Sequence, residues 1–190
     1  MKWLMLYARS RQVPVWAAAV ALTTLAACVF EQGGREPMDL GIATLILTTN
    51  VTAASVGLGG QDLALDRTAA IRWAPRRTAH VLLLGAVAAV ALLAVQVTGP
   101  ALPPAAVVLR DSAGLAGLAA LGAAVVGAAH AWTLPTGWLA LSFFTPPLSG
   151  DAGKACHWML EPAGTPPATW TACVLLATGT VLYALTGSRR

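Results

Sequence analysis

Charge is scarce in this sequence. Only 11% of its 190 residues are charged, whereas 57% are hydrophobic. Soluble globular domains carry about 25% charged residues. The composition therefore excludes an ordinary soluble globule. With a mean hydropathy of +0.68 and recurrent long apolar runs, it predicts that lipid surrounds most of the chain.

Groups for catalysis or metal binding are scarce too. The three cysteines, Cys28, Cys156 and Cys173, have neither metal-ligand spacing nor a disulfide pattern. Ionisable residues are nearly absent from the apolar runs, which argues against an intramembrane enzyme. The stretch SGDAGKAC, 149–156, lacks the first glycine and the Ser or Thr of a phosphate loop. We expect no catalytic residue, no metal and no cofactor.

The three histidines offer no clear chemistry. His80 and His130 lie at the ends of predicted helices, and neither has an acid at a telling spacing. We favour an interfacial or capping role for both. His157 follows Cys156 in a predicted connection, and two adjacent residues do not form a metal site.

Long apolar runs are abundant, and they predict an all-α, polytopic membrane helix bundle in a single domain, 1–190. A spanning helix needs roughly 20 mostly apolar residues. Six segments approach that length. The fifth is the weakest, because its apolar part is short and contains Pro135, so it is expected to be broken or re-entrant. The predicted spans are 13–30, 40–59, 79–97, 113–131, 132–147 and 169–187.

The basic residues predict the orientation. If both termini are cytoplasmic, nine of the twelve Lys and Arg residues lie inside, and only Arg35, Arg110 and Lys154 lie in outer connections. Such a bias is typical of cytoplasmic loops. It favours six crossings in a bacterial cytoplasmic membrane.

Cys28 leaves one alternative open. The residues LAAC, 25–28, follow a basic start and an apolar run, as they do before the lipidated cysteine of a bacterial lipoprotein. An ordinary first span is favoured, because several further spans follow. A mature chain that begins at Cys28, seen by intact mass, would overturn this choice.

The second span is the most polar. Its hydroxyl side chains recur at steps of four, four and three, so they share one helical face. One interpretation is the wall of a polar pathway; the other, which we favour, is hydrogen bonding to the helix's own carbonyls or to neighbouring helices. Asn50 is expected to face protein or water. The candidate pathway residues are Thr44, Thr48, Asn50, Thr52 and Ser55.

The segment 61–78 gathers positive charge between two spans. Asp62 is a good N-cap, and the pattern from Asp62 to Trp73 suits an amphipathic helix of about three turns. Pro75 can then start the third span. The aspartates argue against a nucleic-acid site. A protein-docking helix is favoured over a helix that only anchors the chain to lipid.

Three stretches carry a family resemblance. LDRTAAIRWAPRRTAHVLLL, 65–84, LRDSAGLAGLAALG, 109–122, and WTACVLLATGTVLYALTGSRR, 170–190, are similar to small ABC-2-like membrane proteins of actinobacteria. The layout of six spans, a short helix after the second and a broken fifth span likewise resembles an ABC-2-type permease subunit of an ABC transporter. The similarity covers about residues 60–190.

The resemblance implies a non-enzymatic exporter subunit whose cytoplasmic helix docks on a separate ATP-binding cassette ATPase. It also implies a second membrane subunit, either a second copy or another chain. The alternative is a scaffold or accessory subunit that anchors a partner complex without forming a pathway. The residues implied as docking contacts are Asp62, Leu65, Asp66, Arg67, Ile71, Arg72 and Trp73.

Overall fold

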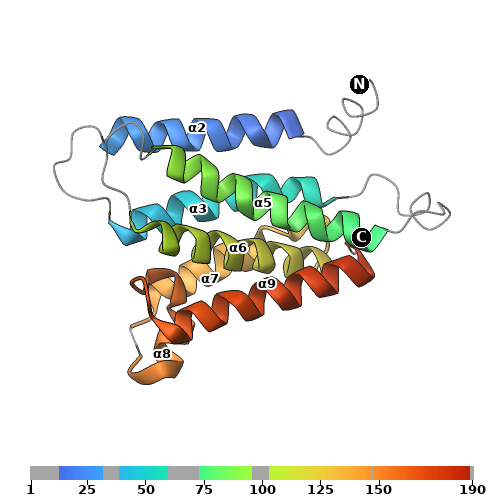
Figure 1. The fold of residues 1–190 in the computed structure, drawn as a ribbon. Helices are drawn as coiled ribbons and strands as arrows, with labels where there is room; N and C mark the ends of the chain where they lie inside the picture. Colours follow the sequence, from blue (N-terminus) through green and yellow to red (C-terminus); the bar gives the residue numbers. More distant parts are fainter. Residues whose placement is uncertain (1–12, 32–38, 60–72, 96–102, 147, 189–190) are drawn as a thin grey trace.

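The computed structural model describes residues 13–31, 39–59, 73–95, 103–146 and 148–188. These residues form helices and turns, with no strand among them, so the all-α prediction is confirmed for this part of the chain. The helices lie roughly along one direction as a bundle (Figure 1). They are α2 Val13–Glu31, α3 Leu40–Ser55, α5 Trp73–Val95, α6 Ala105–Val125, α7 Thr133–Phe144, α8 Gly150–Cys156 and α9 Pro166–Thr186, with 3-10 turns η1 Val56–Leu58, η3 Ala128–His130 and η4 Trp158–Leu160.

Four helical stretches are long and apolar enough to cross a membrane: Leu40–Leu58, Trp73–Val95, Ala105–Val125 and Pro166–Thr186. In α2, the segment Ala17–Ala26 is apolar as well. The chain is therefore a membrane-embedded protein. α7 has only 12 residues, about 18 Å of helix, which is well short of a bilayer core of about 30 Å.

Two predicted boundaries differ clearly from the structure. The third helix begins at Trp73 and not at 79, so Trp73 opens α5 instead of ending a separate helix, and Pro75 lies in its first turn. Proline is tolerated there because the first turn leaves its N–H groups unpaired anyway. The fourth helix runs over Ala105–Val125 and not 113–131. It begins directly after Pro104, and Gly127, with φ 121°, marks the turn that follows its end.

α6 is the centre of the bundle. Fifteen of its 21 residues are buried, as expected for a helix rich in Gly and Ala, because small residues let neighbouring helices approach closely. The closest approach is to α9: a Cβ on Gly117 would collide with the backbone of Leu175, and one on Gly179 with the carbonyl of Gly117. Both helices run in the same direction, so α7 must carry the chain back between them (Figure 1).

The two ends of the bundle are formed by different elements. We call them the α8 end and the Arg77 end. At the Arg77 end, the Tyr183 hydroxyl donates to the Leu58 carbonyl at 2.7 Å, and Arg77 donates to the Ala184 carbonyl at 3.4 Å. The end of α3, the start of α5 and the end of α9 are therefore neighbours there. At the α8 end, α8 and η4 fold against the start of α9 (Figure 1).

Candidate functional site at the α8 end

A buried ion pair lies in the second turn of α6. Arg110 Nε and Asp111 Oδ1 are 2.8 Å apart, and the two side chains are 6% and 1% exposed. Ionisable side chains inside a membrane protein are expensive and usually functional. The sequence analysis placed Arg110 in an outer connection. That assignment fails because α6 begins eight residues earlier than expected and takes both charges into the bundle.

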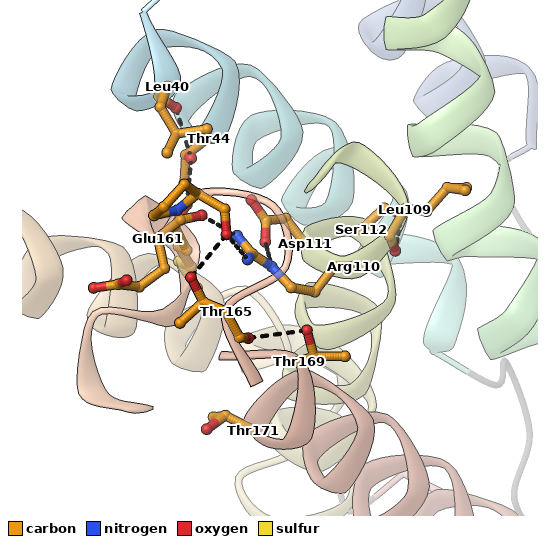
Figure 2. Close-up of polar contacts among 12 residues, drawn as sticks. Leu40, Thr44, Leu109, Arg110, Asp111, Ser112, Glu161, Thr165, Thr169 and Thr171 are labelled. Carbon is orange, nitrogen blue, oxygen red and sulfur yellow. Dashed lines mark hydrogen bonds and ion pairs between the residues drawn. The ribbon is translucent and has the colours of Figure 1, made fainter. Parts of the chain in front are cut away.

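The guanidinium of Arg110 also holds the chain that enters α9. Its Nη2 donates to the Glu161 carbonyl at 2.7 Å, and its Nη1 donates to the Pro162 carbonyl at 3.1 Å. Figure 2 shows the side chain reaching from α6 to these carbonyls, with the Asp111 carboxylate beside it. Charge-assisted hydrogen bonds of this kind are the stronger class. Arg110 therefore fastens the η4–α9 junction to the core helix.

η4 is packed deeply between the helices. Trp158 and Met159 are both 0% exposed. The Trp158 ring lies where a side chain on Gly114 would stand, so the glycine of α6 provides its space. The Thr44 hydroxyl of α3 lies 3.1 Å from the Met159 carbonyl, a second polar tie to this turn. η4 is thus inserted into the bundle, whereas α8 before it exposes Asp151 and Lys154.

Three buried polar atoms near this turn lack a hydrogen-bond partner among the described residues: Asp111 Oδ2, Ser142 Oγ and Trp158 Nε1. They come from α6, α7 and η4. Buried polar groups are normally satisfied by protein or by ordered water. Together with the buried Arg110–Asp111 pair, these atoms mark the α8 end as the candidate site.

The hydroxyls of the candidate pathway residues of α3 bond to carbonyls of their own helix. Thr44 and Thr48 are buried, and their hydroxyls donate to Leu40 O and Thr44 O at 2.8 Å each. Thr52 and Ser55 likewise donate to carbonyls of their own helix, Thr49 O at 2.9 Å and Thr52 O at 2.7 Å. These bonds are the ones expected of hydroxyls satisfied within a helix.

Asn50 faces protein. It is 0% exposed, its Oδ1 accepts a hydrogen bond from the Thr23 hydroxyl of α2, and its Nδ2 donates to Thr24 Oγ1 at 3.4 Å. Carboxamide and hydroxyl groups of this kind join helices within membranes. Asn50 therefore ties α2 to α3.

The candidate docking contacts lie almost entirely outside the described residues: only Trp73 is described. It occupies the first turn of α5, with the guanidinium of Arg76 5.7 Å from its ring centroid. The others, Asp62, Leu65, Asp66, Arg67, Ile71 and Arg72, belong to 60–72. The docking interpretation stays a prediction.

Sequence reasoning missed the Arg110–Asp111 pair. A signal was present: Arg-Asp-Ser directly precedes a predicted span, and the apolar residues Ala105–Leu109 before it could have extended that helix outward. Among the described residues, no group of three His, Cys, Asp or Glu side chains could hold a metal ion. Comparisons with protein-family models, with curated proteins and with solved structures find no match for this chain.

Proposed function

We propose that this chain is the membrane-spanning permease subunit of an ABC-2-type exporter in a bacterial cytoplasmic membrane, energised by a separate cytoplasmic ATPase. In this proposal the Arg77 end faces the cytoplasm and the α8 end faces outward. The chain pairs with a second membrane subunit, either another copy or a related chain. It hydrolyses no ATP itself.

The observation that carries the proposal is the broken crossing between α6 and α9. α6 and α9 lie side by side and run in the same direction, so the chain must return across the membrane between them. α7 covers only part of that distance, and η4 turns back into the bundle with Trp158 and Met159 fully buried. A broken fifth span followed by an outer segment is the layout on which the family resemblance depends.

The arrangement at the Arg77 end is compatible with the proposal. Arg77 at the start of α5 and Ala184 near the end of α9 lie together, joined by the hydrogen bond described above. The basic residues of this end would then meet the cytoplasm and its anionic lipid surface. The segment 60–72, between α3 and α5, would present the docking helix to the ATPase there.

The test is association with the ATPase. An ATPase reading frame beside this gene would supply the partner, and the two proteins would be co-expressed and purified through a tag on this chain. We expect the triple substitution Arg67→Glu, Ile71→Asp and Arg72→Glu to remove the ATPase from the eluate. Lys154→Glu, on α8 at the other end, is the matched control and should leave it bound. Unchanged association of the triple variant would refute the docking helix.

A membrane scaffold without a pathway is the second candidate. The hydroxyls of Thr48, Thr52 and Ser55 are already bonded to carbonyls of α3, which leaves the second span with fewer free polar groups than its sequence suggests. This candidate predicts that Thr48→Leu and Asn50→Leu leave the activity of the complex intact while changes in 61–78 abolish assembly. The permease proposal predicts that at least one of these α3 variants lowers export.

A further inference from the structure

A groove lies between α5, α6 and α9, near the middle of α5. It has a volume of about 150 Å³ and is lined by residues of all three helices. Small side chains create it. α5 and α6 approach closely at Gly85, where an added Cβ would lie 3.1 Å from the Cβ of Ala116. Beside this contact, the side chains of Ala86, Ala89 and Ala113 line the groove and are too short to fill it.

The groove is apolar and open to the surroundings of the bundle. Leu82 and Leu109, which line it, are 50% and 54% exposed. Among the described residues that line it, Ser112 carries the polar side chain, and its hydroxyl donates to the Leu109 carbonyl at 3.0 Å. A bound water needs two to four polar partners, so water is a poor occupant. The three helices are long and apolar enough to span a membrane, so the surroundings are lipid acyl chains.

An exposed stripe of α5 leads to this groove from a charged residue. Its members recur at steps of three, four, three and four, so they share one helical face. All of them are exposed: Arg76, Ala79, Leu83, Ala86 and Val90. The stripe begins beside Trp73, whose ring centroid lies 5.7 Å from the Arg76 guanidinium, and tryptophan is typical of the level of lipid headgroups.

The length of the stripe fits one lipid leaflet. Ala86 lines the groove and lies about 15 Å along the helix from Arg76, at a rise of about 1.5 Å per residue. This is half of a hydrocarbon core of about 30 Å. An acyl chain that starts from a headgroup at Arg76 therefore reaches the groove.

The distribution of charge favours an anionic headgroup at this place. Arg76 and Arg77 lie together at the start of α5, and basic residues at a membrane surface attract anionic lipids. The acidic side chains that the structure describes belong instead to the α8 end. They are Asp39, Asp111, Asp151 and Glu161.

A second copy of the chain would fit the apolar groove but not this charge. Membrane subunits of one kind commonly pair about a two-fold axis. An axis along the membrane normal would bring the Arg76 residues of both copies to the same level, where like charges repel each other.

We propose that the groove holds an acyl chain of an anionic phospholipid whose phosphate group is bound by Arg76. The lipid then joins α5 to α6 and α9 as a part of the bundle, whether or not the chain is a transporter. Its acyl chain fills the space that Gly85 and its small neighbours leave, and its headgroup lies beside Trp73.

Photocrosslinking identifies what fills the groove. p-Benzoylphenylalanine replaces Leu82 in the lining of the groove, or Val174 on the exposed face of α9 as the control. The full chain is placed in nanodiscs with equal amounts of phosphatidylglycerol and phosphatidylcholine, irradiated, and its intact mass is measured. At position 82 we expect adducts enriched about fivefold in phosphatidylglycerol, the effect of one basic residue at a membrane surface. At position 174 the two lipids should react in proportion to their amounts.

Paired variants separate the headgroup contact from the groove. Arg76→Gln should return the lipid ratio at position 82 to that of the bilayer, whereas Lys154→Gln, exposed at the α8 end, should leave the enrichment in place. Ala86→Phe, which fills the groove, should lower the yield of all lipid adducts at position 82. Ala177→Phe, the same change at an exposed position of α9, should not.

Two results would overturn the proposal. A covalent dimer linked through position 82 would show that a second copy covers the groove. Equal lipid ratios at positions 82 and 174 would show that the groove does not select an anionic lipid. Both results are independent of whether an ATPase binds this chain.

Discussion

α6 and α9 have the same length and nearly the same hydropathy, yet they have opposite surroundings. Each has 21 residues, with mean hydropathies of 1.4 and 1.5. In α6, 67% of the most apolar window is buried inside the protein, against 22% in α9. α6 is rich in Gly and Ala, whereas α9 exposes Trp170, Val181 and Leu185. Hydropathy therefore shows that both helices enter the membrane, and side-chain size separates the core helix from the lipid-facing one.

The largest expected effect concerns the charges of α6. Asp111→Ala would leave the buried guanidinium of Arg110 without its carboxylate, and such a loss destabilises a protein by about 3–5 kcal/mol. On α9, Thr178→Ala removes an exposed hydroxyl that bonds to its own helix, so we expect less than about 0.5 kcal/mol. Unfolding by SDS in mixed micelles measures both. Equal, small effects would show that the pair is not buried as described.

A smaller effect is expected in the apolar core. Leu118 on α6 is 1% exposed, whereas Val181 on α9 is 57% exposed. Leu118→Ala should leave a cavity and destabilise the fold by about 2–4 kcal/mol. Val181→Ala should change the unfolding free energy by less than about 0.5 kcal/mol, because lipid can fill the space. An equal loss of unfolding free energy in both variants would contradict the burial of Leu118 and the exposure of Val181.

The smallest effect tests the contact between the two helices. Gly117→Ala adds one methyl group that would collide with the backbone of Leu175, and overpacking of this kind costs about 1–3 kcal/mol. Gly137 on α7 has nothing within 4 Å of an added Cβ. Gly137→Ala should be neutral or slightly stabilising, because alanine favours helix by about 1 kcal/mol over glycine. Thermal denaturation in the same detergent should give a lower melting temperature for Gly117→Ala and an unchanged or higher one for Gly137→Ala.

Much of this architecture follows from residue patterns. The apolar runs predicted the helices α3, α5 and α9 within a few residues, except that α5 begins earlier at Trp73. The short run around Pro135 predicted an incomplete fifth span, and α7 is indeed short. The burial of α6 agrees with its richness in Gly and Ala. Each of these features depends on the length or the side-chain size of a single segment, so the residues of that segment are enough to predict it.

The candidate site was not predictable in the same way. Arg110 looked like a loop residue, because the fourth span was predicted to begin only at residue 113, whereas α6 begins at Ala105. Its partners, the carbonyls of Glu161 and Pro162, lie about fifty residues further along the chain. Only packing of α6 against the start of α9 brings them within reach. The oxygen atoms around the His157 ring likewise come from two segments, the end of α7 and α8.

The sequence by itself determined that this chain is a bundle of membrane-embedded helices, because the length and hydropathy of a segment decide whether lipid can solvate it. Tertiary structure alone decided which polar groups lie inside the bundle. It took Arg110 and Asp111 into the protein interior and inserted η4 between the helices. Burying a charge is tolerable only where distant backbone and side-chain groups supply its hydrogen bonds, and a linear sequence does not show which groups those are.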